Sequence, residues 1–162
     1  MRTLAATTFL LAATAVGCRP TEEDVRRIAR EELQGAMARQ AVTSANVIGP
    51  YSPAVRIGDF LFVSGQIALD QETGAMRQDD IEVETHQVLA NVMRILRSQD
   101  FDSSHVVSAT VYLKNMNDYA AVNKVYAGYF QEKNFPARVA VEVADLPKQA
   151  NVEIAVIAYR DH

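Results

Sequence analysis

The sequence predicts an α+β domain in which two helices pack on one face of a mixed β-sheet. From residue 41 onward, short apolar runs with strand periodicity alternate with two helical patterns in the order ββαβαββ. Two helices on one face form a two-layer sandwich and leave the other sheet face to be covered. The last strand is hydrophobic on both sides around Glu153, so we expect an oligomer to cover that face.

The first two strands form a predicted hairpin. Residues 59–64 are a short apolar run, and Ile57, Gly58 and Asp59 predict a tight turn that leads into it from residues 53–56. The sheet therefore begins with two antiparallel neighbours.

Three further strands follow from periodicity. Residues 106–113 alternate between apolar and partly polar side chains. The last two strands are expected near residues 137–143 and 152–159. A hairpin through Pro147 would place these two strands side by side.

Each predicted helix begins at a capping residue. Asp79 and Asp80 can cap the first helix, and Asn117 or Asp118 can cap the second, because their side-chain oxygens accept hydrogen bonds from the first turn. One face of the first helix carries Thr85, Val88, Leu89, Val92, Ile95 and Leu96. The second helix carries Tyr119, Val122, Val125, Tyr126, Tyr129 and Phe130.

The N-terminal residues have the pattern of a targeting segment. Arg2 supplies a positive charge, residues 4–15 form an apolar stretch too short to span a bilayer, and small residues lead to Cys18. Residues 15–18, Ala-Val-Gly-Cys, resemble the lipobox of bacterial lipoproteins, in which the signal is cut before the cysteine and the cysteine is acylated. We expect a signal peptide at residues 1–17; an ordinary secretory peptide is the alternative.

This interpretation implies that the protein is exported and anchored to the bacterial cell envelope, with the periplasmic face favoured. The lipid on Cys18 would be its only membrane attachment. Residues 18–40 would then be the anchor and a helical spacer, capped by Thr21 and followed by the domain at residues 41–162. A short coiled coil is the alternative to a solvated spacer, although the apolar stripe is shorter than stable coiled coils need.

Composition excludes several classes. Hydrophobic residues make up 49% of the chain, which is enough for one domain with a core, and a single cysteine cannot form an internal disulfide. Cleavage would remove Arg2 from the 16 basic side chains, so 15 would face 20 acidic ones and the net charge would be −5. Nucleic acid is therefore not an expected partner. The three histidines show no metal-ligand spacing, so no metal site is expected.

Five motifs together resemble the RidA/YjgF family of enamine/imine deaminases. They are Ile-Gly-Pro-Tyr-Ser-Pro-Ala at residues 48–54, Val-Ser-Gly-Gln-Ile at 63–67, Val-Tyr-Leu-Lys-Asn-Met-Asn-Asp at 111–118, Phe-Pro-Ala-Arg at 135–138 and Val-Glu-Ile at 152–154. The similarity spans about residues 43 to 160, in order and with compatible spacing. It implies a chorismate-mutase-like fold and a homotrimer with three sites between subunits.

The resemblance also implies an activity. Members hydrolyse 2-aminoacrylate and related enamines or imines to 2-keto acids and ammonia, with no metal or organic cofactor. Arg138 would bind the substrate carboxylate bidentately, a task that suits its planar guanidinium. Glu153 would orient or deprotonate the attacking water. The alternatives from the residues alone are an ion pair between Arg138 and Glu142, and a salt bridge between Glu153 and Arg138.

Further residues are placed at the site by the same resemblance. Tyr51 follows Gly-Pro, a turn that would present its ring at the rim, although a tyrosine there often serves packing alone. Ser64 and Gly65 end a strand and are expected to contact the ligand. Asn123 is expected near the site or in a helix-rim hydrogen bond. Ala140 stands where many members have Cys, Ser or Thr, so the substrate range is expected to differ.

A second hypothesis has the same fold but a different role. Because aminoacrylate is produced mainly by cytosolic enzymes, an exported protein could act on a different imine or bind without catalysis. The alternative is therefore a trimeric protein of the envelope that binds small carboxylates or shields unfolded proteins. Endoribonuclease activity has been attached to relatives, and the net negative charge argues against it.

Overall fold

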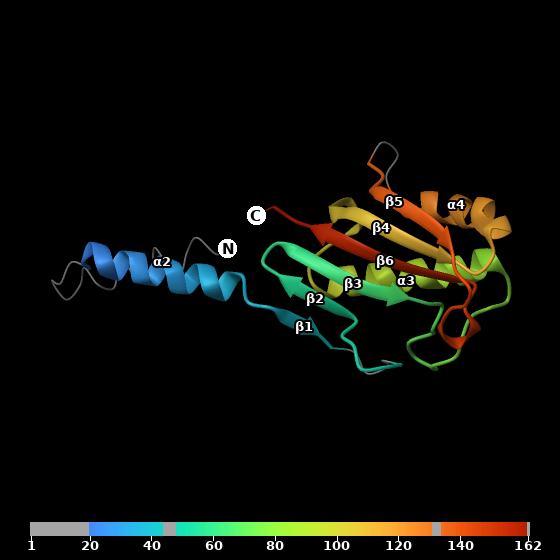
Figure 1. Ribbon diagram of the computed structural model, residues 1–162, viewed down its shortest axis with the longest axis horizontal. Helices are drawn as coiled ribbons and strands as arrows, with labels where there is room; N and C mark the ends of the chain where they lie inside the picture. Colours follow the sequence, from blue (N-terminus) through green and yellow to red (C-terminus); the bar gives the residue numbers. More distant parts are fainter. Residues whose placement is uncertain (1–19, 44–47, 131–133, 162) are drawn as a thin grey trace. The chain divides into compact units, whose positions relative to one another are not determined.

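The computed structural model describes residues 20–43, 48–130 and 134–161 (Figure 1). The expected signal peptide and Cys18 lie outside these ranges. The chain divides into two compact units, Met1–Ala38 and Arg39–His162, which are described separately.

The first unit contains helix α2 (Glu22–Ala36). Its cap is as predicted: the backbone N–H of Asp24 donates to Thr21 Oγ1 at 3.1 Å, and the backbone N–H of Thr21 donates to Asp24 Oδ2 at 3.1 Å. No residue of α2 is buried. Its role as a spacer or a coiled coil stays a prediction. No helix in the described ranges combines the length and the apolar character that a membrane crossing requires.

The second unit is the predicted two-layer sandwich. Its strands are β1 (Gln40–Val42), β2 (Ala54–Ile57), β3 (Phe60–Gln66), β4 (Val106–Leu113), β5 (Ala137–Glu142) and β6 (Val152–Tyr159). They form one mixed sheet in the order β1-β2-β3-β6-β4-β5, in which only β4 and β5 are parallel. Helices α3 (Ile81–Ser98) and α4 (Tyr119–Ala127) lie behind this sheet (Figure 1).

The predicted hairpin is confirmed near the start of the sheet. Ile57 pairs with Phe60, so Gly58 and Asp59 form the two-residue turn of the hairpin. Gly58 has a φ of 57°, a conformation that glycine adopts without steric cost. Strand β1 was not predicted, because three largely exposed residues carry no readable alternation.

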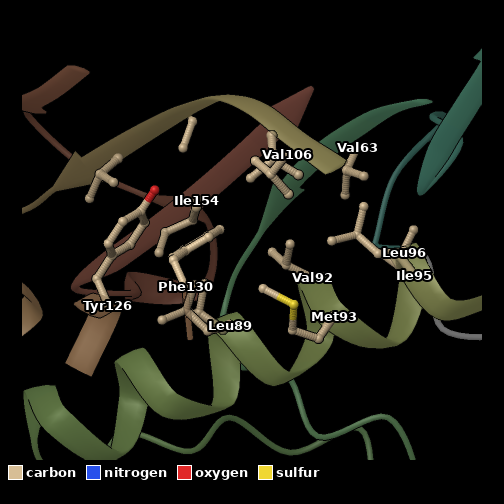
Figure 2. Packing of buried hydrophobic residues seen from close by; sticks show 14 of the residues in the cluster. Val63, Leu89, Val92, Met93, Ile95, Leu96, Val106, Tyr126, Phe130 and Ile154 are labelled. Carbon is tan, nitrogen blue, oxygen red and sulfur yellow. The ribbon is translucent and has the colours of Figure 1, made fainter. Parts of the chain in front are cut away.

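The core lies between α3 and the sheet. The predicted apolar face of α3 is confirmed, and Figure 2 shows Leu89, Val92 and Leu96 packed near Val63 and Ile154 of the strands. At the start of α3, Asp80 Oδ1 accepts from the backbone N–H of Val83 at 2.8 Å, as predicted.

The predicted N-cap position of α4 is correct, but the expected capping hydrogen bond is absent. Asp118 occupies the N-cap position but its side chain makes no capping hydrogen bond. Asn115 instead caps the preceding 3₁₀ turn, Met116–Asp118, by accepting from the backbone N–H of Asn117 at 3.0 Å. This turn feeds directly into α4, so its cap replaces the expected one.

The expected hairpin between the last two strands is also wrong. β5 pairs in parallel with β4, and β4 lies between β5 and β6. The physical reason is burial: β6 is apolar at nearly every position, and the centre of the sheet covers it better than a place near the edge would. The connection after β5 crosses β4 through a turn in which Lys148 and Gln149 have φ values of 55° and 58°.

The sheet face away from the helices is rich in exposed apolar side chains. Five of them are between 37% and 51% exposed: Phe60, Phe62, Val139, Val141 and Tyr159. The aromatic members cluster, with the rings of Phe60 and Tyr159 5.0 Å apart between centroids. This is the open face that the sequence predicts.

A fully buried carboxylate joins α3 to the start of β6. Glu84 is 0% exposed, and its two oxygens accept from the backbone N–H and the side-chain Nδ2 of Asn151, each at 2.7 Å. The carbonyl of Asn151 accepts from the backbone N–H of Lys114 at 2.9 Å. Asn151 is thereby fixed two residues before Glu153.

Replacing Glu84 by alanine should lower the free energy of unfolding by about 2–4 kcal/mol, because two partly buried donors of Asn151 would lose a fully buried acceptor. Urea unfolding at fixed protein concentration measures this. The matched control is Glu82→Ala, which removes an exposed pair with Lys124 and should cost less than about 1 kcal/mol. Equal losses in the two variants would contradict the anchoring role.

Candidate functional site

Arg138 faces a cavity between β5 and α4. The cavity has a volume of about 410 Å³ and is lined by Asn123, Tyr126, Ala127, Phe135, Pro136 and Arg138. Its lining combines apolar side chains with the polar groups of Asn123 and Tyr126, and among the described residues the guanidinium is its one charged group. Such a cavity favours a small anion with an apolar body.

Two tyrosines of α4 hold the guanidinium. Its Cζ lies 4.6 Å from the ring centroid of Tyr126 and 5.7 Å from that of Tyr119. Arg138 Nη2 also donates to the hydroxyl of Tyr119 at 3.3 Å. Burial raises the pKa of Tyr126 to about 12, although Arg138 opposes this shift, so its phenol stays neutral beside the cation.

Neither ion pair considered for Arg138 is present. Glu142 lies on the same strand, but its Oε2 accepts from the backbone N–H of Met116 at 2.7 Å. Within the described ranges, no carboxylate comes within 4.0 Å of the guanidinium. Among the described residues, the Arg138 guanidinium therefore has no carboxylate partner.

Glu153 faces a second cavity. Its volume is about 250 Å³, and its lining is Ile48, Tyr51, Ser64, Gly65, Ile67, Pro147 and Glu153. Tyr51 is 45% exposed at this cavity. Ser64 Oγ donates to the carbonyl of Ser52 at 2.7 Å, which fixes the strand end against the Tyr51 turn.

Glycine at position 65 makes room for the carboxylate. A Cβ at Gly65 would lie 1.7 Å from Glu153 Oε1, so any side chain there would displace the carboxylate. The strand irregularity between Val63 and Gln66 falls at this point. Desolvation raises the pKa of Glu153 above the ordinary value of 4.5, which suits a group that takes up and returns a proton.

The two cavities lie on opposite faces of the sheet. Arg138 pairs with Ala109 of β4, and Ala109 is in the core beneath the helices. Glu153 pairs with Tyr112, three residues further along the same strand. Because neighbouring positions of a strand face opposite ways, Ala109 and Tyr112 point to different faces. One small substrate therefore cannot contact Arg138 and Glu153 of the same protomer.

The structure thus divides the predicted site residues into two groups. Asn123 lies with Arg138, whereas Tyr51, Ser64 and Gly65 lie with Glu153. Ala140 follows Arg138 on the same strand and packs against the core. In the described part of the chain, no cluster of three His, Cys, Asp or Glu side chains could hold a metal ion.

Several lining residues were not predicted as site residues. They are Tyr126, Phe135, Pro136, Ile48, Ile67 and Pro147. Tyr119 is outside both linings and joins the site through its hydrogen bond with Arg138. The helical spacing places Tyr119 and Tyr126 in the apolar stripe of a helix. Their seven-residue spacing on the face that also holds Asn123 was the available signal, because such positions share one side of a helix.

The stability of the Glu153→Gln variant relative to the wild type should depend on pH. Since the pKa of Glu153 is raised in the folded protein, ionisation there destabilises the wild type, and the penalty is absent below the ordinary value of 4.5. The variant should therefore gain stability over the wild type as the pH rises from below 4.5 through the raised pKa. Denaturant unfolding over this pH range measures the unfolding free energy of the variant minus that of the wild type. A value that stayed constant or fell as the pH rose would contradict the burial of a charged Glu153.

Comparison with known proteins gives a consistent result. The family model described as "Endoribonuclease L-PSP" matches residues 41–160. A RutC family protein of Pyrococcus horikoshii is 51% identical over 114 residues, which cover 70% of this chain and 90% of that protein. A 2-iminobutanoate/2-iminopropanoate deaminase of Capra hircus is 41% identical over 126 residues, which cover 76% of this chain and 91% of that enzyme.

Solved structures agree with this assignment. The YjgF gene product of E. coli is 38% identical, with a TM-score of 0.70, and the match covers 76% of this chain and all of that one. E. coli TdcF with bound serine is 32% identical, with a TM-score of 0.71, over 75% of this chain and 99% of that one. The fold and the comparisons together show that the chain belongs to the RidA/YjgF family, for which a trimer is typical.

Proposed function

We propose that the protein hydrolyses short imino or enamine carboxylic acids, such as 2-aminoacrylate, to 2-keto acids and ammonia. The observation that carries this proposal is the guanidinium of Arg138, which faces a cavity with no carboxylate of the described residues beside it. Deaminase relatives at about 40% identity support it. The bound serine of TdcF, an amino acid with a free carboxylate, supports the same ligand class.

The proposed reaction assigns one role to each charged group. Arg138 binds the substrate carboxylate through two parallel hydrogen bonds and fixes the position of the imine carbon. Glu153 takes a proton from a water molecule, whose oxygen then bonds to that carbon. The proton is returned to the nitrogen, which gives a carbinolamine with a hydroxyl and an amino group on the same carbon. The hydroxyl proton then passes to the nitrogen as the carbon–nitrogen bond breaks, so ammonia leaves and a ketone remains. An enamine substrate enters this sequence after it tautomerises to the imine by moving a proton from its nitrogen to its terminal carbon. One water is consumed and no electron is transferred.

We further propose that each site is built from two copies of the chain. Since Arg138 and Glu153 lie on opposite sheet faces, the Arg138 cavity of one protomer would face the Glu153 cavity of the next. The exposed apolar side chains on the open face support this assembly, because burying them between copies is favourable. In a cyclic trimer the same contact repeats three times and yields three equivalent sites.

A subunit-mixing experiment tests both proposals. Arg138→Ala and Glu153→Gln should each abolish the release of ammonia and keto acid from 2-aminoacrylate generated in solution. When the two inactive variants are denatured together and refolded as mixed trimers, about a quarter of the sites should combine an intact Arg138 with an intact Glu153 from its neighbour. Activity should therefore return.

The outcomes separate the alternatives. Mixed trimers that remain inactive would show that the two groups do not meet between copies. Full activity of Arg138→Ala would reject the deaminase mechanism. If the wild type bound a 2-keto acid tightly but turned over no imine, the carboxylate-binding alternative would be preferred.

We also propose that the protein is attached to the cell envelope through an acylated Cys18. The support is the sequence alone: a positive residue, a short apolar stretch and small residues before the cysteine. In cells that express the full chain, the wild type should fractionate with membranes, whereas Cys18→Ala should not. A Cys18→Ala protein that still fractionated with membranes would contradict the lipid anchor.

A further inference from the structure

We propose that Tyr119 is a positioning residue, whose hydroxyl holds the Arg138 guanidinium in the orientation that receives a carboxylate. This inference rests on the proposed role of Arg138 as the carboxylate-binding group. It concerns the first residue of α4, which lies outside the motifs that identify the family.

The contacts of the guanidinium differ in what they restrain. The rings of Tyr126 and Tyr119, at 4.6 and 5.7 Å, attract the cation but depend weakly on its rotation, because a ring face has no directional acceptor. The hydrogen bond from Nη2 to the Tyr119 hydroxyl is directional. Within the described ranges it is the only hydrogen bond that the Arg138 side chain makes. It therefore sets which edge of the guanidinium faces the cavity.

The hydroxyl of Tyr119 is itself held. Besides the hydrogen bond from Arg138, the side chain of Asn123 acts on it from one helical turn further along α4. Both lower the pKa of Tyr119, as expected when donors point at the phenol oxygen. Asn123 and Arg138, which both line the cavity, therefore both act on the phenol oxygen of Tyr119.

The phenol oxygen also keeps a donor for the ligand. It accepts from Arg138, while no described residue accepts its own hydrogen. Tyr119 is 41% exposed, so that hydrogen can reach a bound molecule. A carboxylate on Arg138 would then receive hydrogen bonds from the guanidinium and from the neighbouring phenol. Phenylalanine would keep the ring contact and lose both functions.

Tyr119→Phe tests the inference with a change of one oxygen atom. The KM for imine hydrolysis and the Kd for 2-oxobutanoate, measured by calorimetry, should each rise about tenfold, the usual effect of losing a hydrogen bond to a charged group. The kcat should stay within about twofold, because Tyr119 acts on carboxylate binding and the imine carbon reacts only after the carboxylate is bound.

Tyr129→Phe is the matched control. It also removes a partly buried hydroxyl, one that donates to the carbonyl of His86 at 3.1 Å and lines neither cavity. Its KM and Kd should equal those of the wild type. A Tyr119→Phe variant that bound 2-oxobutanoate as tightly as the control, while Arg138→Ala bound none, would overturn the positioning role and leave the proposed function standing.

A second measurement needs no ligand. The side-chain N–H signals of Arg138 in nitrogen-15 NMR, assigned with Arg138→Lys, should broaden or shift in Tyr119→Phe because rotation of the guanidinium is released. They should be unchanged in Tyr129→Phe. Unchanged signals in Tyr119→Phe would contradict the inference whether or not the protein is a deaminase.

Discussion

The structure depends on the central position of β6. This strand is hydrogen-bonded to β3 on one side and to β4 on the other, and its alternate residues Val152, Ile154, Val156 and Ala158 are buried beneath α3. A strand with apolar residues on both faces is most stable at the centre of a sheet, where both faces can be covered and both edges are hydrogen-bonded. The buried Glu84 fixes the start of β6 through Asn151, so the register of the whole sheet is tied to one helix.

The site groups take their positions from this strand. Gly65 lies on β3, where its missing side chain accommodates the carboxylate of Glu153. Arg138 is placed from the other side, through the parallel pairing of β5 with β4. The same sheet therefore presents an acid on one face and a cation on the other. The acid is partly desolvated and the cation is held by aromatic rings, which are the environments that proton transfer and carboxylate binding respectively require.

Local patterns predicted most of the fold because they report burial directly. The alternation of residues 106–113 and the helical spacing from Val88 to Leu96 each follow from facing one core, and both are confirmed. The pairing of β5 was not predicted, because a turn residue such as Pro147 indicates a change of direction and says nothing of which strand is the neighbour. β1 was missed because three exposed residues carry no burial signal. The site residues were chosen by resemblance, and the sequence order could not reveal that Arg138 and Glu153 lie on opposite faces. The sequence does not distinguish Tyr119 as a site residue, because a tyrosine in an apolar helical stripe gives the same pattern whether its ring packs or its hydroxyl forms a hydrogen bond.

The placement of Arg138 and Glu153 on opposite faces has a consequence for how the proposed activity responds to the amount of protein. A chain whose two reactive groups point away from each other has no working form as a monomer, however well it is folded. Turnover per chain would fall on dilution as the assembly dissociates, and it would do so before any loss of secondary structure. The rate of synthesis of such a protein would then control its activity per chain as well as its quantity, because under the proposed assembly a chain would be active only when bound to another copy.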